Sequence, residues 1–342
     1  MPVVHAERLR EFARSILEAT GTPEELARIV GDSLVDANLA GHDSHGMLRI
    51  VQYVRFARAG HVQPAARACV VARRGATARV DGAWGWGQPA MTLASETAVE
   101  LASEFGIGAV VVHRCFHIGR AAPYVELAAR AGMVALTTVS AGPAVAPYGG
   151  RTRVLGTNPV AWAVPRGHDQ DPLSFDIATS GVAEGKLQVA RAKGEPAPPG
   201  CVLDVNGQPS LDPEDFYAGG SLLPFGGHKG YGFGVLAHVL GRALVGVDSD
   251  RYPGPPGTNG PVMIALNPAY FGSFDEFSAE VAAQCDVIAS APPAEGVKAV
   301  LLPGDPEIAS RRRREAEGIP IPDRTWNELT ALAAELGIEV GN

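Results

Sequence analysis

The spacing of apolar residues predicts that the first sixty residues form helices. After Gly21, residues 22–25 read Thr-Pro-Glu-Glu, a capping residue, a first-turn proline and a capping-box glutamate, so a second helix should begin there and end at Gly41. A third helix should follow the turn at residues 42–46 and run to about Ala59. The first helix is indicated by apolar residues at helical intervals, Leu9, Phe12, Ala13 and Ile16.

From about residue 68 the pattern changes to one in which short β-branched runs alternate with helical stretches. Such alternation indicates an α/β domain whose strands are buried. Strands are predicted at residues 69–72, 78–80, 108–112 and 133–139, and helices at 90–105 and 121–130. Loops are predicted at the glycine- and proline-rich residues 142–149, 194–200 and 254–261.

A chain of 342 residues is too long for one small core, so two or three packed subdomains are expected. We predict a helical N-terminal subdomain at residues 1–67, an α/β domain at 68–300, and a C-terminal helical segment at 301–342 that packs on the first. Hydrophobic residues make up 46% of the chain and charged residues 19%, which is typical of a globular enzyme.

The charge balance argues against nucleic acid and anionic membranes as partners. Lys and Arg number 29 and Asp and Glu 37, which gives a net charge of −8. The one dense basic run, Arg311 to Arg314, is predicted to be a solvated helix face, with a contact to a dinucleotide phosphate as the alternative. The most apolar later stretch, residues 233–247, is interrupted by His238 and Arg242, so no transmembrane helix is expected.

Cysteine usage predicts a reducing compartment. Cys69, Cys115, Cys201 and Cys285 are isolated, without the spacing of a disulfide framework or a zinc cluster. The first residues lack a basic head followed by an apolar core. We therefore expect a cytoplasmic protein.

Residues 41–53 concentrate groups that active sites use. If Ser44 caps a helix, His45, Arg49 and Tyr53 fall four residues apart and share one helical face beside free backbone amides. A carboxylate would fit there. The alternative, weighted equally for the stretch alone, is a polar helix start with a solvated face.

A second candidate is the loop at residues 116–120, between a predicted strand and a predicted helix. Loops at this position in α/β proteins often carry ligand-binding groups, and His117 could transfer protons near neutral pH. A loop imidazole that caps the next helix is the alternative. His113 and His117 have metal-type spacing, but no carboxylate completes a site, so no metal is expected.

The stretch from Gly85 to Ala90 matches the G-x-G-x-x-A pattern of dinucleotide-binding turns. We set the Rossmann interpretation aside because Trp86 is bulky and Pro89 removes an amide donor that a pyrophosphate needs. The expected acidic ribose ligand is also missing, since His113 and Arg114 stand in its place.

Three turn-rich segments, at residues 149–159, 175–180 and 224–232, are crowded with small hydroxyl, amide and glycine residues that suit phosphates or sugars. Lys229 lies in the last of them but lacks the spacing of a phosphate-binding P-loop, which argues against ATP hydrolysis. Ordinary turns and helix caps are the alternative for each segment taken alone.

Taken together, these segments resemble the malate/L-lactate dehydrogenase family of the second type, which includes ureidoglycolate dehydrogenase, sulfolactate dehydrogenase, diketogulonate reductase and piperideine-2-carboxylate reductase. They occur in the family's order over nearly the full chain. The resemblance rests on Asp43 to Gly46 with Arg49 and Tyr53, His117 to Gly119, Ala146 to Gly150, Gly156 to Pro159, Asp176 to Ser180, Lys229 to Gly232, and Pro303 to Glu307.

The resemblance implies a three-layer α/β/α fold with a mixed sheet that binds NAD or NADP without a Rossmann unit, and a homodimer with its site near the subunit contact. It implies catalytic roles for Ser44, His45 and His117, and substrate binding by Arg49, Tyr53, Thr157 and Asn158. It implies cofactor binding by Ile118, Gly119, Arg120, Asp176, Ala178, Thr179, Ser180, Lys229, Gly230, Gly304, Asp305 and Glu307.

The expected activity is hydride transfer between nicotinamide and C2 of a small 2-hydroxy or 2-oxo acid, with an imidazolium of His45 or His117 as proton donor. Reduction of a cyclic imine or a sugar-derived 2-keto acid is the first alternative, and a small-molecule binding protein is the second. The chain departs from the common pattern at His113-Arg114-Cys115, where Asn-Ser is frequent, and at Lys186, where the imine reductases tend to be acidic.

Overall fold

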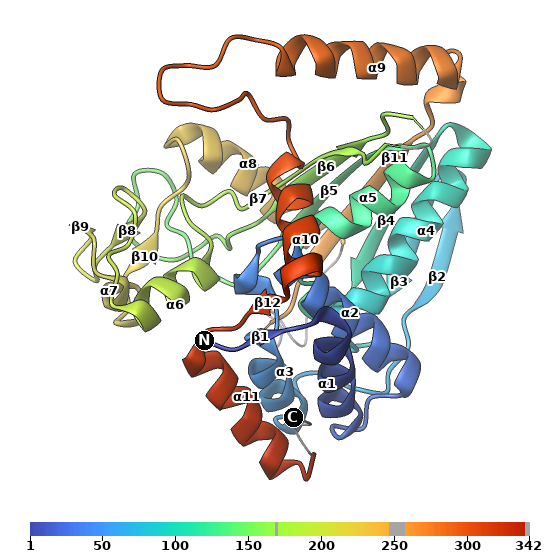
Figure 1. Cartoon of the computed structure of the whole chain (residues 1–342). Helices are drawn as coiled ribbons and strands as arrows, with labels where there is room; N and C mark the ends of the chain where they lie inside the picture. The colour runs from blue at the N-terminus through green and yellow to red at the C-terminus, as the bar shows by residue number, and fades with distance from the viewer. Residues whose placement is uncertain (168–169, 246–256, 339–342) are drawn as a thin grey trace.

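The computed structural model describes residues 1–167, 170–245 and 257–338, and a mixed seven-stranded sheet lies at its centre (Figure 1). The strands in spatial order are β2 (Cys69–Arg74), β3 (Thr77–Asp81), β4 (Ile107–His113), β11 (Gly260–Leu266), β5 (Val134–Ser140), β6 (Val160–Val164) and β7 (Leu173–Ile177). Among the described strands of this sheet only β3 and β4 pair in parallel. The sheet is therefore not the parallel sheet of a Rossmann unit, as expected.

Helices cover both faces of this sheet, which makes three layers. The helices α4 (Gly87–Phe105) and α5 (Ala122–Arg130) pack on one face against a core that includes Val110 and Val112. On the other face α8 (His228–Val239) and the π-helical turn η2 (Leu240–Leu244) contact β5 and β11. The three-layer α/β/α prediction is confirmed.

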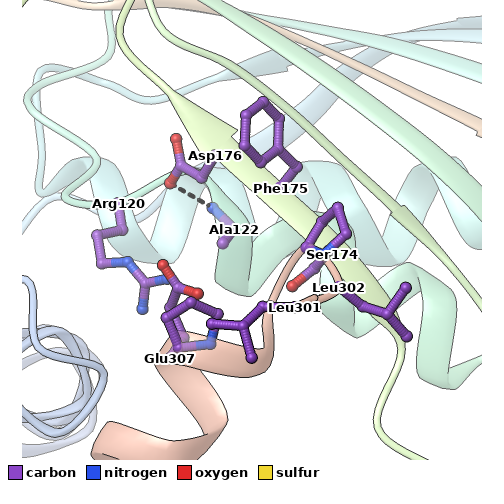
Figure 2. Close-up of a pocket in the computed structure, with 11 residues that line it drawn as sticks. Arg120, Ala122, Ser174, Phe175, Asp176, Leu301, Leu302 and Glu307 are labelled. Carbon is purple, nitrogen blue, oxygen red and sulfur yellow. Dashed lines mark hydrogen bonds between the residues drawn. The ribbon is translucent and has the colours of Figure 1, made fainter. Parts of the chain in front are cut away.

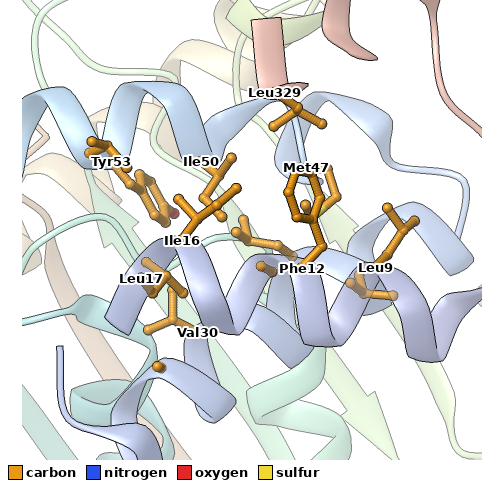
Figure 3. Packing of buried hydrophobic residues seen from close by; sticks show 14 of the residues in the cluster. Leu9, Phe12, Ile16, Leu17, Val30, Met47, Ile50, Tyr53 and Leu329 are labelled. Carbon is orange, nitrogen blue, oxygen red and sulfur yellow. The ribbon is translucent and has the colours of Figure 1, made fainter. Parts of the chain in front are cut away.

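A second core joins the two ends of the chain (Figure 3). It is built by α1 (Ala6–Glu18), α2 (Glu24–Leu39), α3 (Arg49–Arg58) and α11 (Asp323–Glu335), beside the paired strands β1 (Val3–Val4) and β12 (Ile319–Pro320). Leu9, Ile16 and Leu17 on α1 are fully buried, each contributing on the order of 2 kcal/mol through removal from water. Between the two cores lies α10 (Asp305–Glu317), which contacts α2.

Residues 181–223 form a small unit, here called the α6/α7 lobe, around a third hydrophobic cluster that Val145 and Leu155 also join. It holds α6 (Glu184–Lys193), α7 (Pro213–Tyr217) and a three-stranded sheet of β10 (Ser221–Leu222), β8 (Val202–Leu203) and β9 (Pro209–Ser210). Leu187, Val202 and Phe216 are buried in its centre. The helix α9 (Phe274–Ala289) follows the short turn η4 (Pro268–Tyr270) and stands apart from the layers (Figure 1).

Two local predictions were wrong. The N-cap of α2 is Pro23, not Thr22, because the Thr22 hydroxyl accepts a hydrogen bond from Trp86 Nε1 instead of capping the helix. Gly260 and Pro261, predicted to lie in a loop, begin β11, while part of that predicted loop falls outside the described residues. In the part of the chain that the structure describes, no helix has the length and apolar character needed to cross a bilayer. The domain boundaries stay predictions.

Candidate active site

The structure brings together the three side chains that the sequence singled out most strongly. The rings of His45 and His117 stack with their centroids 5.9 Å apart and their planes 13° from parallel. Arg49 is buried close to both, since its positive charge contributes to lowering both imidazole pKa values. A guanidinium and two imidazoles therefore lie close together although they come from two distant parts of the chain.

The prediction that Ser44 caps the third helix was wrong. Asp43–His45 is a separate 3-10 turn, η1, and α3 begins only at Arg49, so His45 does not share a helical face with Arg49 and Tyr53. The turn brings the Ser44 hydroxyl to 3.0 Å from Nδ1 of His45.

Two residues that sequence reasoning missed hold η1 in place through Asp43. Asn38 Nδ2 donates to Asp43 Oδ1 over 2.6 Å, and a side chain at Gly46 would collide with the Asn38 amide. Arg314 NH1 donates to the same Oδ1 over 2.6 Å, and its side chain is only 11% exposed. The predicted solvated face of Arg311 to Arg314 is therefore wrong for Arg314, and Arg311 forms an ion pair with Asp36.

All three nitrogens of the Arg49 guanidinium have acceptors inside the protein. Nε donates to the carbonyl of Ser44 over 2.7 Å, NH1 to Gln52 Oε1 over 3.0 Å, and NH2 to Glu184 Oε2 over 3.2 Å. The contact with Glu184 joins α3 to the first turn of α6. Side-chain patterns did not predict Glu184, because only the tertiary fold brings α6 to this position.

A chain of hydrogen bonds fixes the tautomer of the neutral His117 ring. The backbone N–H of Gly119 lies 3.3 Å from His117 Nδ1, and the Tyr53 hydroxyl lies 2.7 Å from the same atom. Gln88 Nε2 donates to the Tyr53 hydroxyl over 2.9 Å, which leaves that hydroxyl free to donate to His117. Nδ1 is thus the acceptor, so we assign the proton of the neutral ring to Nε2.

The G-x-G-x-x-A stretch supports this chain of hydrogen bonds. Gly87 opens α4 directly against the His117 loop, and a β-carbon there would collide with the carbonyls of Phe116 and His117. The absence of a side chain lets Gln88 reach Tyr53, which is 1% exposed. The Tyr53 hydroxyl therefore contacts both Gln88 and His117, and its predicted contact with substrate stays a prediction.

Both imidazoles are neutral at pH 7. Burial lowers the pKa of His117 to about 3, with a further contribution from Arg49. Burial also lowers the pKa of His45 well below its usual range, helped by Arg49 and His117. An imidazolium that donates a proton during reduction would therefore have to form after the substrate binds.

A cavity of about 310 Å³ lies where several of the predicted cofactor residues meet (Figure 2). It is lined by Arg120, Asp176, Gly304 and Glu307 among others. Arg120 is 7% exposed, and its Nε has no hydrogen-bond partner within the described part of the chain. A buried cationic donor without a partner beside a cavity fits the phosphate of a dinucleotide.

The acidic residues that line this cavity already form hydrogen bonds within the protein. Asp176 Oδ2 accepts from the backbone N–H groups of Ala121 and Ala122 at the start of α5, and Glu307 pairs with His42 Nε2 over 2.9 Å. The bond from His42 lowers the pKa of Glu307. Asp305 accepts from the N–H of Leu302, so its carboxylate closes the turn before α10.

Five further predicted cofactor residues lie at the end of β7 and the start of α8: Ala178, Thr179, Ser180, Lys229 and Gly230. The carbonyl of Thr179 accepts from the N–H of Phe225, Gly230 packs against the same carbonyl, and Ser180 forms a bridge with Pro224. Lys229 is exposed in the first turn of α8. Ala178 joins this cluster to Asp176, so the two groups of predicted residues are continuous along the chain.

Two further predicted residues, Asn158 and Thr157, hold loops around the site together through hydrogen bonds. Asn158 is fully buried and uses both ends of its amide, since Oδ1 accepts from Ala141 N–H and Nδ2 donates to the Gly234 carbonyl. The Thr157 carbonyl accepts from Thr179. The N–H of Ile118 donates to Asn259, another residue that the sequence did not reveal. Among the described residues, no group of three or more His, Cys, Asp or Glu side chains could hold a metal ion.

The family model for malate/L-lactate dehydrogenase matches residues 4–330. The chain belongs to this family. Membership confirms the predicted enzyme class, an oxidoreductase of hydroxy or oxo acids, and the predicted resemblance.

Known proteins resemble the chain over nearly its whole length. Hydroxycarboxylate dehydrogenase B of Escherichia coli K12 is 39% identical, covering 97% of this chain and 94% of that protein. The Δ1-pyrroline-2-carboxylate/Δ1-piperideine-2-carboxylate reductase of Pseudomonas putida is 34% identical, covering 96% and 95%. The solved structure of sulfolactate dehydrogenase from Methanocaldococcus jannaschii superimposes with a TM-score of 0.89 at 34% identity, covering 99% and 98%.

Proposed function

We propose that this enzyme transfers a hydride between a nicotinamide dinucleotide and C2 of a small 2-hydroxy or 2-oxo acid, at the site formed by Arg49, His45 and His117. The convergence of one buried guanidinium with two neutral imidazoles carries the proposal. These groups match the needs of such a substrate, which has one carboxylate to be held and one oxygen that gains or loses a proton.

Arg49 would bind the substrate carboxylate. Its Nε donates to the Ser44 carbonyl, so a carboxylate would bind at NH1 and NH2. Each of these nitrogens has a second N–H beside the one that contacts Gln52 or Glu184. A carboxylate held there presents C2 to the two rings. Its negative charge also offsets the charge of Arg49 that lowers both imidazole pKa values, so substrate binding should raise both.

The two rings would divide the proton chemistry. His117, with its proton on Nε2, donates a hydrogen bond to the C2 oxygen and stabilises negative charge as it grows. His45, paired with Ser44, removes the hydroxyl proton during oxidation of the hydroxy acid and returns it during reduction of the oxo acid.

The cofactor, NAD or NADP, supplies or accepts the hydride when bound. Arg120 would hold a phosphate, and Asp176 and Glu307 line the same cavity. Lys229 at the start of α8 offers a second cation. The predicted cofactor roles of Ile118, Gly119, Ala178, Thr179, Ser180, Gly230, Gly304 and Asp305 are kept in this proposal.

We also propose a homodimer in the cytoplasm. The sequence of α8 is mostly apolar after its first turn, yet Phe233, Leu236 and Val239 are each about half exposed, and Val287 of α9 is 67% exposed. A largely apolar helix is normally buried, so a second copy would cover α8 and the projecting α9. All four cysteines are free thiols, which fits a reducing compartment.

Loss of reduced nicotinamide is the decisive measurement, with NADH and NADPH each tested on pyruvate, oxaloacetate, a sugar-derived 2-keto acid and Δ1-piperideine-2-carboxylate. Turnover of a 2-oxo acid supports the main proposal. Turnover of the imine alone would favour the alternative that the Pseudomonas relative suggests. If the chain binds the reduced nicotinamide and a 2-oxo acid without turnover, a small-molecule binding protein would be the remaining interpretation.

A further inference from the structure

The carboxylate of Glu184 contacts Arg49 at NH2, one of the two nitrogens that a substrate carboxylate would need. Glu184 Oε2 lies 3.2 Å from Arg49 NH2, and the Glu184 side chain is 26% exposed while that of Arg49 is 9% exposed. Because Nε donates to Ser44 and NH1 to Gln52, the guanidinium has an internal acceptor on each nitrogen. A guanidinium has five N–H groups, so these three contacts leave one on NH1 and one on NH2. A substrate carboxylate bound there would bring a second negative charge beside Glu184 and favour its release.

Glu184 is the partner that the structure equips for displacement. Its other oxygen, Oε1, accepts from the Tyr217 hydroxyl over 3.0 Å and from Gln188 Nε2 over 2.8 Å. Both donors belong to the α6/α7 lobe and not to the catalytic turn, so they can keep the carboxylate hydrogen-bonded after Oε2 leaves Arg49. Ser44 and Gln52 each face Arg49 through a single carbonyl oxygen, whereas the Glu184 carboxylate has a second oxygen that is already hydrogen-bonded to the lobe.

The backbone around Glu184 shows how closely the α6/α7 lobe approaches the site. A β-carbon on Gly185 would lie 2.6 Å from Ser44 Cβ and 2.8 Å from Arg49 NH2. Glycine at this position lets the first turn of α6 rest directly on η1. Beside this contact lies a cavity of about 580 Å³ between α3, α6 and the C-terminal segment, lined by Gln52, Gln188 and Tyr217.

We propose that Glu184 is an exchangeable internal partner of Arg49. The Glu184 carboxylate holds Arg49 until the carboxylate of a 2-oxo acid replaces it, so Glu184 sets the affinity of the site for its substrate. The inference rests on the proposed role of Arg49. It makes Glu184 a specificity-determining residue on the lobe and not a catalytic residue, because it competes for binding and does not touch the reacting carbonyl.

The test uses oxamate, an amide analogue of a 2-oxo acid that accepts no hydride, with the full chain in the presence of NADH or NADPH, whichever supports turnover. Glu184→Gln keeps the size of the side chain and removes its charge, so the Kd of oxamate and the KM of the accepted 2-oxo acid should both fall five- to tenfold. kcat should change less than twofold. Glu195→Gln, an exposed carboxylate of the same lobe, is the matched control and should leave both constants unchanged.

Weaker or unchanged oxamate binding by Glu184→Gln would show that Glu184 supports Arg49 or is unconnected with it, and would overturn the proposal. If that variant fails to fold, a crystal structure of the unmodified enzyme with oxamate decides the matter, since the Arg49 to Glu184 contact should open beyond hydrogen-bond distance. Bound oxamate with the 3.2 Å contact intact would overturn it. A failure of the proposed function can be told apart from a failure of this inference. If Arg49 does not bind the substrate carboxylate, Arg49→Leu would bind oxamate as the unmodified enzyme does.

Discussion

The hydroxyl of Tyr53 lies 2.7 Å from Nδ1 of His117 and also accepts a hydrogen bond from Gln88. This relationship lets a residue expected to contact substrate set the tautomer of another side chain as well. The proton of His117 is thereby directed to Nε2.

Tyr53→Phe removes the hydroxyl and keeps the buried ring. We expect kcat to fall about tenfold, corresponding to about 1.4 kcal/mol, because His117 loses the bond that fixes its tautomer. KM should change little when the hydroxyl acts through His117 alone. Steady-state kinetics measure both constants, and Tyr270→Phe at an exposed position is the control. A raised KM with unchanged kcat would instead indicate direct substrate binding.

Arg49→Leu should raise KM and lower kcat together. A lost charge-assisted pair with a carboxylate costs about 2–3 kcal/mol, so kcat/KM should fall on the order of a hundredfold for every accepted acid. Arg58→Leu, on the exposed side of the same helix, is the matched control. Unaltered kinetics in Arg49→Leu would refute the role of Arg49.

Stability should fall as the medium becomes acidic. Because the pKa of His117 is about 3 in the folded protein and about 6.5 when unfolded, the unfolded chain binds the extra proton between these values. The stabilising contribution is therefore complete above pH 6.5 and is lost as the pH falls from 6.5 toward 3. Each unit below 6.5 should cost about 1.4 kcal/mol for His117, and the lowered pKa of His45 adds a loss of the same sign.

Urea unfolding at pH 7.5 and 5.5 measures this dependence. His117→Gln should have a shallower pH dependence than the unmodified protein, and His5→Gln, at an exposed position, is the matched control. An equal slope in His117→Gln and the unmodified protein would contradict the lowered pKa.

Gly87→Ala should destabilise the His117 loop. The added methyl group collides with two backbone carbonyls that have little freedom to move, so we expect a loss of about 2 kcal/mol or more in the free energy of unfolding. kcat should fall as the loop shifts. Gly142→Ala, where nothing lies within 4 Å of the added carbon, is the control. Unchanged stability in Gly87→Ala would show that the loop can move aside.

Leu236→Asp tests the proposed dimer. A charge in the centre of a buried apolar face opposes association, so sedimentation should show a shift from dimer to monomer. Val205→Asp changes an exposed apolar residue on the α6/α7 lobe and should leave the assembly unchanged. A monomeric unmodified chain would remove the proposal altogether.

Apolar periodicity was enough to predict most of the elements, because a helix or strand buries one face and the sequence repeats at that period. The helix at 90–105 and the strand at 108–112 were predicted within a few residues of α4 and β4. Local patterns failed where a contact distant in sequence decided the structure. Thr22 is an example, since its hydroxyl bonds to Trp86 and does not cap α2.

For the site, the sequence by itself determined which reactive groups are present and that Arg49 and Tyr53 share a helix, because their spacing follows from helical geometry. Only the tertiary structure decided which groups face one another. Burial made both imidazoles neutral, Gln88 and Tyr53 fixed the proton of His117, and the packing of α6 placed Glu184 on Arg49. Hydrogen bonds and desolvation depend on distances in space, which residues far apart along the chain acquire only when the chain folds.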